Sequence, residues 1–196
     1  MSAAALPNQP ETRIELGQDL VLQALDASQA ETIYAAVDAN REHLRVWLPW
    51  VDFSRSPADT LRFLQEMEAK RAAALTVAYS LWTGPTELVG IIGVHDISLA
   101  NGNLQIGYWV AKAQEGKGLI SRACEAMLRL AFETLGMERV EIRCAEGNQR
   151  SARVPERLGF QFEGILRHSA KLHGEFVDMR LYSLLAEEYR QRRGSA

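Results

Sequence analysis

The sequence predicts an α/β (α+β) domain built around a mixed β-sheet. Apolar residues alternate along several short segments separated by Gly-containing turns, which favours antiparallel strand pairs. A helical pattern lies between two such segments, at 104–111 and 139–145, and a crossover helix of this kind favours a parallel pair. A chain of 196 residues that is 47% hydrophobic can bury the core of one domain.

The N-terminal part is expected to hold a strand pair followed by helices. These segments are 13–25 for two strands joined by a Gly-Gln turn, then 26–40, 41–53 and 56–71 for the helical pieces. In the first helix Ile33 and Val37 recur at helical spacing after Asp and Ser, which are good N-caps. Pro49 breaks the second piece, and Ser56 followed by proline is typical of a helix start.

The rest of the chain alternates between strand and helix patterns. We expect strands at 74–82, 88–97, 104–111, 139–145, 160–170 and 175–185, and helices at 119–136 and 148–159. In the longer helix, Ile120, Met127 and Leu130 belong to one apolar stripe, and Gly136 ends it. The basic segment 190–193 is interpreted as a solvated helix end.

Residues 1–12 are expected to be a flexible N-terminal arm, and residues 13–196 a single domain. The arm lacks the basic segment followed by an apolar one that marks a secretory leader. No apolar run approaches the roughly 20 residues that span a bilayer, so we expect no membrane partner. The two cysteines form no disulfide framework, which weakly favours a cytoplasmic protein.

Charge and side-chain chemistry exclude two further classes of function. The net charge of −3 provides no broad basic field, so we expect no nucleic-acid partner. Cys124 and Cys144 lie at apolar positions and are interpreted as small core residues. The histidines are not spaced with acids along a helix, so no metal site is expected; they are His43, His95, His168 and His173.

The stretch AQEGKGLISRAC, residues 113–124, carries the main functional signal. Gly116 and Gly118 let the backbone adopt positive φ and approach a ligand closely. The first amides of a helix have no internal partner, and with the helix dipole they favour an anion. The stretch matches neither common nucleotide motif, because a Walker loop needs glycine at Ala111 and a dinucleotide loop needs glycine at Ser121. A plain turn stays the alternative from this loop alone.

Two longer stretches, GYWVAKAQEGKGLISRAC and GNQRSARVPERLGFQFEG, extend this signal. In order and spacing they resemble the GCN5-related N-acetyltransferase (GNAT) superfamily, and most of all its ribosomal-protein-serine acetyltransferase branch, over roughly residues 13–186. The resemblance implies the GNAT fold, with a mostly antiparallel seven-stranded sheet, helices on both faces, and strands 104–111 and 139–145 splayed around the coenzyme. It also implies direct acetyl transfer from acetyl-CoA to a primary amine, and it is compatible with a homodimer.

The resemblance also implies which residues contact acetyl-CoA. The backbone of Glu115, Gly116, Lys117, Gly118, Leu119, Ile120 and Ser121 would wrap the pyrophosphate. Val110 would pair with the pantetheine arm or polarise the thioester carbonyl. Asn148 would hydrogen-bond the arm, and Ser151 would donate to the departing thiolate. The alternative for Asn148 and Ser151 is that they only begin a helix.

Three positions depart from the family pattern and leave the acid and base open. Pro155 replaces a tyrosine acid, Gln105 replaces a glutamate, and Ala170 lies where the ribosomal branch tends to have an acid. Pro155 also frees the carbonyl of Ser151 from its helical partner. Ala113, where a glutamine or arginine is usual, is a smaller loss, because the loop binds mainly through its backbone.

His95, beside Asp96, is the candidate base, because imidazole changes protonation near neutral pH. A structural histidine is the alternative, as is deprotonation of the amine by water. Glu163, Asp178 and His168 on the last hairpin are weaker candidates for the base.

The acceptor side is the least defined. Trp47 and Trp50 flank a proline and could wall an acceptor cleft or pack in the core. Arginines near them could meet an acidic acceptor or be solvated; they are Arg41, Arg45 and Arg55. The acceptor could be a ribosomal protein N-terminus, a small amine or an antibiotic. A non-catalytic acyl-CoA-binding regulator and a pure interaction module remain as alternatives.

Overall fold

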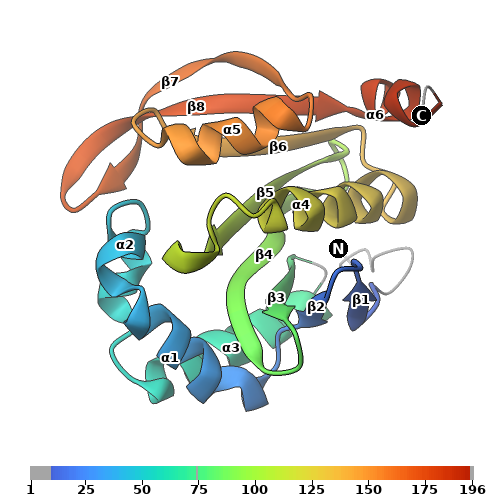
Figure 1. The fold of residues 1–196 in the computed structure, drawn as a ribbon. Helices are drawn as coiled ribbons and strands as arrows, with labels where there is room; N and C mark the ends of the chain where they lie inside the picture. The colour runs from blue at the N-terminus through green and yellow to red at the C-terminus, as the bar shows by residue number, and fades with distance from the viewer. Residues whose placement is uncertain (1–9, 74, 195–196) are drawn as a thin grey trace.

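The structure is a computed structural model that describes residues 10–73 and 75–194 (Figure 1). Its strands form one eight-stranded sheet in the order β1-β2-β3-β4-β5-β6-β8-β7. The strands are β1 (Arg13–Glu15), β2 (Leu20–Ala24), β3 (Val77–Thr83), β4 (Glu87–Ser98), β5 (Asn103–Val110), β6 (Arg139–Ala145), β7 (Gln161–Leu172) and β8 (Glu175–Leu185). The count of seven implied by the resemblance is therefore wrong by one, because β1 and β2 both join the sheet, as the eight segments expected from the sequence pattern allow.

The helices agree with the expected order. They are α1 (Ala30–Ala39), α2 (Arg41–Arg45), α3 (Pro57–Ala72), α4 (Leu119–Arg129), α5 (Gln149–Arg157) and α6 (Ala186–Gly194), with short turns η1 (Ala27–Gln29), η2 (Pro49–Phe53), η3 (Lys112–Gln114) and η4 (Leu130–Thr134). The expected helix at 119–136 changes hydrogen-bonding pattern after Arg129, because η4 is a π turn. Within the described residues, no helix is both long and apolar enough to cross a membrane.

The sheet is antiparallel except for the β5–β6 pair, whose parallel pairing follows from the crossover through α4. That pairing is short: Asn103 to Gln105 pair with Arg139 to Glu141, and the register then ends. Ile106–Val110, which we call the splayed segment, therefore pairs with β4 on one edge and, among the described residues, with no strand on the other. The expected splay of the two strands is confirmed.

Apolar side chains cover both faces of the sheet. One buried cluster joins the strands to α4 and α5 and includes Cys124 and Cys144, which confirms both cysteines as core residues. The other joins the strands to α1 and α3 and includes Trp109. Figure 1 shows α4 and α5 near β5 and β6, with α1, α2 and α3 grouped beyond β4.

The start of the described chain is bonded to the domain. Residues 1–9 of the expected arm lie outside the described residues, as does residue 74 of an expected strand. The carbonyl of Pro10 accepts a hydrogen bond from Arg71, and that of Glu11 accepts one from the Tyr79 hydroxyl at 2.9 Å.

Candidate active site

The splayed segment presents main-chain groups that no strand in the described part of the chain uses. The amide of Ala111 donates to the carbonyl of Val89, at 2.8 Å, on the β4 side. Successive residues of a strand direct their amides to opposite edges, so the N–H of Val110 faces the edge that β6 has left. This edge can pair with an extended ligand or donate to a carbonyl oxygen.

The glycine loop follows directly. Gly116 and Gly118 both have φ of +74°, the left-handed conformation, and Gly118 is the N-cap of α4. Among the described residues, no main-chain amide from Gly116 to Ser121 has a hydrogen-bond partner. A turn of free amides at the positive end of a helix dipole suits a phosphate or pyrophosphate.

Charged side chains surround this loop. The Glu115 carboxylate forms an ion pair with Arg150 of α5, and it lies 3.3 Å from the Nε2 of His43 on α2. The Arg157 guanidinium donates to the hydroxyl of Ser121 at 3.1 Å, and the Lys117 ammonium donates to a glutamine side chain. Cationic groups thus lie around the free amides, and the acid in the loop is paired.

Asn148 and Ser151 lie at the start of α5. The Asn148 side-chain oxygen accepts the amide proton of Ser151 at 3.1 Å, so the helix-capping role is confirmed. The cap uses the oxygen and leaves the side-chain NH₂, which has no partner within the described part of the chain. Asn148 can therefore cap the helix and also donate to a ligand.

Tyr108 is a site residue that the sequence pattern did not reveal. Its hydroxyl donates to the carbonyl of Ser151 at 3.2 Å and lies 3.3 Å from the Ser151 Oγ. Pro155 has no N–H to offer that carbonyl, so Tyr108 supplies the missing donor. The proline in the α5 pattern indicated a free carbonyl, but nothing in the alternation of residues 104–111 distinguishes Tyr108 from the apolar residues around it.

His95 lies on β4 and contacts the carboxylate of the next residue, Asp96. Its Nδ1 is 3.2 Å from Asp96 Oδ2, and Gln105 donates to the same oxygen at 3.0 Å. A carboxylate only accepts, so this contact favours the tautomer with hydrogen on Nδ1 and a free lone pair on Nε2. Nε2 would lie 3.1 Å from a Cβ built on Gly107, which places it beside the splayed segment.

His95 and Tyr108 approach the splayed segment from different faces. Gly107 and Tyr108 are neighbours on β5, and neighbouring strand residues point to opposite faces. The structure therefore brings His95 near the segment but not to Ser151.

Two of the three other proposed bases, Glu163 and Asp178, accept hydrogen bonds from neighbouring groups. Glu163 accepts two hydrogen bonds from Arg139, at 2.7 and 2.6 Å, which with Ser183 lower the pKa of its carboxyl to about 2. Asp178 accepts the main-chain N–H of His168 at 2.8 Å. In residues 10–73 and 75–194, no cluster of His, Cys, Asp and Glu is arranged to hold a metal ion.

The two tryptophans proposed for the acceptor side lie outside the buried core. Trp47 is half-buried, and its ring lies 3.3 Å from a Cβ built on Gly147, next to Asn148. Trp50 is 39% exposed. The alternative that Trp50 packs in the core is therefore wrong, because the η2 turn leaves this side chain at the surface.

Two of the arginines proposed to meet an acidic acceptor already bind groups within the chain. Arg41 donates to the carbonyls of Val51 and Ser54, and Arg45 pairs with Asp52. Their first role is to hold η2 against α2.

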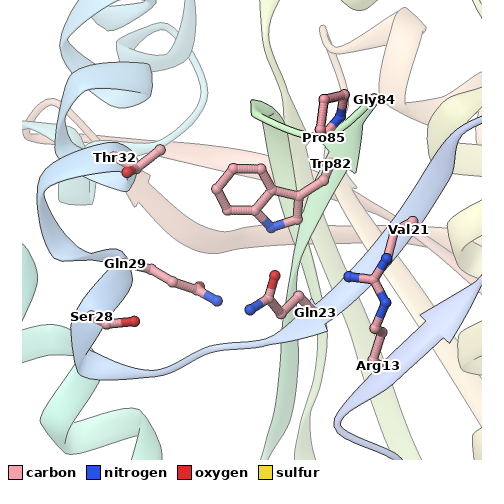
Figure 2. A pocket seen from close by; sticks show the side chains of 9 residues that line it. All are labelled: Arg13, Val21, Gln23, Ser28, Gln29, Thr32, Trp82, Gly84 and Pro85. Atoms are coloured by element: carbon pink, nitrogen blue, oxygen red, sulfur yellow. The ribbon is translucent and has the colours of Figure 1, made fainter.

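A separate pocket of about 270 Å³ lies at the β1–β2 side of the sheet (Figure 2). It is lined by Arg13, Val21, Gln23, Ser28, Gln29, Thr32, Trp82, Gly84 and Pro85. Figure 2 shows the Gln23 and Gln29 amides extending toward each other below Trp82. None of the predicted site residues lines this pocket, so it is distinct from the glycine loop and the splayed segment.

Comparison with known proteins agrees with this geometry. The family described as "Acetyltransferase (GNAT) domain" matches residues 19–161. The "Putative ribosomal N-acetyltransferase YdaF" of Bacillus subtilis is 34% identical over 178 residues, which cover 89% of this chain and 96% of the relative. The ribosomal-protein-serine acetyltransferase of Escherichia coli is 26% identical over 174 residues, covering 89% and 97%.

The fold is also found among solved structures. The ribosomal L7/L12 α-N-protein acetyltransferase RimL, in complex with coenzyme A, superposes with a TM-score of 0.85 at 24% identity, covering 90% of this chain and 99% of that one. The match to the family over most of the chain, together with the splayed strands and the glycine loop, assigns it: this chain belongs to the GNAT family of acetyltransferases.

Proposed function

We propose that this enzyme transfers the acetyl group of acetyl-CoA directly to a primary amine, with no covalent enzyme intermediate. The observation that carries the proposal is that two main-chain surfaces without hydrogen-bond partners follow each other along the chain. They are the open edge of the splayed segment and the free amides of Gly116–Ser121. The RimL relative in complex with coenzyme A supports the choice of cosubstrate.

Each surface suits a different part of acetyl-CoA. The amides of the glycine loop suit the pyrophosphate, with cationic side chains such as Arg157 nearby. The edge of the splayed segment suits the amides of the pantetheine arm, which can pair with it as a strand would. The free NH₂ of Asn148 is a further donor to that arm.

The transfer itself needs few groups. The amine nitrogen attacks the thioester carbonyl, a C–N bond forms, and the C–S bond breaks with its electron pair left on sulfur. The N–H of Val110 faces the edge where it can stabilise the oxyanion. The Ser151 hydroxyl hydrogen-bonds the thiolate, which takes its proton from solvent after release. Much of the rate enhancement comes from holding amine and thioester together.

His95 is the proposed base that takes the ammonium proton. The contact with Asp96 leaves the Nε2 lone pair free. Gln105 stands where the family has a glutamate and cannot act as a base, but it donates a hydrogen bond to Asp96. His95 and Ser151 approach the splayed segment from different faces, which suits a base on the acceptor side and a donor on the thiol side.

The first candidate acceptor is the N-terminal amine of a ribosomal protein, because two relatives are named as ribosomal acetyltransferases, one of them "Putative". The exposed Trp50 and the half-buried Trp47 are proposed to contact the acceptor. A small amine or antibiotic acceptor is the second candidate. A cytoplasmic location and a homodimer belong to the same proposal.

The test combines binding and turnover. Calorimetry should give a heat of binding for acetyl-CoA, and thiol release should then rise when a peptide bearing a ribosomal protein N-terminus is added. Release with only small amines would favour the second acceptor class. Binding without release for any amine would indicate an acyl-CoA-binding regulator, and no binding would overturn the proposal.

A further inference from the structure

The hydroxyl of Tyr108 and the start of α5 form a contact that joins two distant parts of the chain. Tyr108 is on the splayed segment, and Ser151 lies 43 residues later on α5. The Tyr108 hydroxyl is within hydrogen-bonding distance of both the Ser151 carbonyl and the Ser151 Oγ. The same side chain thus contacts the backbone and the functional group of the proposed thiolate donor.

The protons of this contact can be assigned from the chemistry of the groups. A carbonyl oxygen only accepts, so the single phenolic proton goes to the Ser151 carbonyl. The Tyr108 oxygen can then accept the Ser151 hydroxyl proton over 3.3 Å. This arrangement fixes the rotamer of Ser151 while no thiolate is present.

Tyr108 does not act as an acid here. Burial, more than any other cause, raises the pKa of its phenol far above the ordinary value. The phenol therefore keeps its proton through the pH range of activity. It can orient its neighbours by hydrogen bonds but cannot supply a proton to the thiolate.

We propose that Tyr108 is a positioning residue. Its oxygen accepts the Ser151 hydroxyl proton in the resting enzyme and so holds the Ser151 Oγ in place, and the hydroxyl turns to donate to the thiolate when that group forms. The inference rests on the proposed function, because it assigns Ser151 a donor role. Pro155 makes the contact possible, since it leaves the Ser151 carbonyl without a helical donor and so anchors the phenol there.

The structural alternative is that Tyr108 only satisfies this carbonyl. Pro155→Ala separates the two roles, because alanine restores an N–H that can bond the Ser151 carbonyl within the helix. If Tyr108 served only that carbonyl, Tyr108→Phe would be harmless once alanine is present. If it positions the hydroxyl, Tyr108→Phe should remain damaging in the Pro155→Ala background.

Steady-state kinetics of these variants is the first experiment. Tyr108→Phe should lower kcat about ten-fold, as expected for one lost hydrogen bond, with the KM for acetyl-CoA nearly unchanged. Pro155→Ala should not rescue it. In a Ser151→Ala background, Tyr108→Phe should have little further effect. Tyr79→Phe, which removes a hydroxyl bonded to the Glu11 carbonyl, is the matched control and should leave kcat unchanged.

Rescue by Pro155→Ala, or a full additional loss in the Ser151→Ala background, would overturn the inference.

A second readout does not need turnover. The affinity for free CoA should rise with pH as its thiol ionises, and both Tyr108→Phe and Ser151→Ala should flatten that rise. Desulfo-CoA should show no such rise. Wild-type protein that binds CoA without releasing thiol from acetyl-CoA would contradict the proposed transfer alone. An unchanged pH dependence in Tyr108→Phe would contradict the role of Tyr108.

Discussion

The carboxylate of Glu115 in the glycine loop forms an ion pair with the guanidinium of Arg150 in the first turn of α5. This pair connects the proposed pyrophosphate site to the helix that Asn148 caps. His43 also contacts Glu115, but partial burial and the neighbouring Lys112 and Arg150 lower the pKa of its imidazole. At neutral pH the imidazole is therefore mainly uncharged, and Arg150 provides the charge that offsets Glu115.

Replacing Arg150 with glutamine should raise the KM for acetyl-CoA about two- to five-fold, because an unpaired Glu115 carboxylate would repel the pyrophosphate. The effect is modest because Arg150 is largely exposed, and exposed pairs contribute up to about 1 kcal/mol. It should shrink at high salt. Steady-state kinetics at two salt concentrations would measure it.

Arg153→Gln is the matched control. Arg153 is exposed on the same helix, and within the described residues it has no ion-pair partner. Equal changes in KM for the two arginine variants would show that only net charge matters. Adding Glu115→Gln to Arg150→Gln should restore the KM.

Gly118→Ala tests the loop itself. Gly118 has a φ of +74°, and a Cβ there would meet no atom within 4 Å, so the cost is backbone strain rather than a clash. We expect a loss of about 1–2 kcal/mol in unfolding free energy. Because the strain re-aims the free amides, acetyl-CoA affinity should also fall about ten-fold in calorimetry.

Gly136→Ala is its control at the other end of the same helical segment. Its φ is +65°, and it too has space for a Cβ. Both variants should lose similar stability, but only Gly118→Ala should lose affinity. If Gly136→Ala weakened binding equally, the loss would come from general destabilisation.

Local features of the site were predictable from the sequence because they depend on neighbours along the chain. The left-handed glycines before α4 and the Asn148 cap three residues before Ser151 are both short-range signals. The splay of β5 from β6 came from the family resemblance, since periodicity alone says where strands lie and not where their pairing ends.

Features that depend on distant contacts were not predictable. In the sequence Tyr108 is indistinguishable from an apolar-face residue, because only the tertiary structure places its hydroxyl within hydrogen-bonding distance of Ser151. Arg41 and Arg45 resembled free cations because their partners lie in a turn whose path only the tertiary structure fixes. The π turn after α4 was also hidden, because an apolar stripe does not distinguish it from a helix end.

His95→Gln tests the proposed base. Loss of general-base catalysis should lower kcat by about 10²-fold or more at neutral pH, with little change in protein stability. Asp96→Asn should lower kcat less, about ten-fold, because an asparagine amide can donate to Nδ1 and permit the wrong tautomer. Rates of amide formation with saturating amine would measure both.

Glu66→Gln, an exposed carboxylate on α3, is the control for Asp96→Asn and should leave kcat unchanged. An undiminished kcat in His95→Gln would mean that water removes the ammonium proton.

Glu163 provides a prediction about acid stability that is independent of catalysis. Its carboxylate is held by Arg139 of β6 and Ser183 of β8, and these partners lower its pKa to about 2. A carboxyl with a depressed pKa stabilises the fold above its unfolded pKa, near 4.5, and loses that contribution as pH falls toward 2. Glu163→Gln should therefore reduce the unfolding free energy by about 1 kcal/mol at neutral pH. This figure is discounted for solvent screening, because 34% of the side chain is exposed.

Urea unfolding of wild type and Glu163→Gln across this range would measure the difference. It should be constant above about pH 5 and shrink steadily below the unfolded pKa, because the protonated wild-type side chain then resembles glutamine. Glu175→Gln, an exposed residue of β8, should give a small difference at all pH values. A Glu163→Gln difference that stayed constant down to pH 2 would show that the pair with Arg139 does not set the acid stability of this edge.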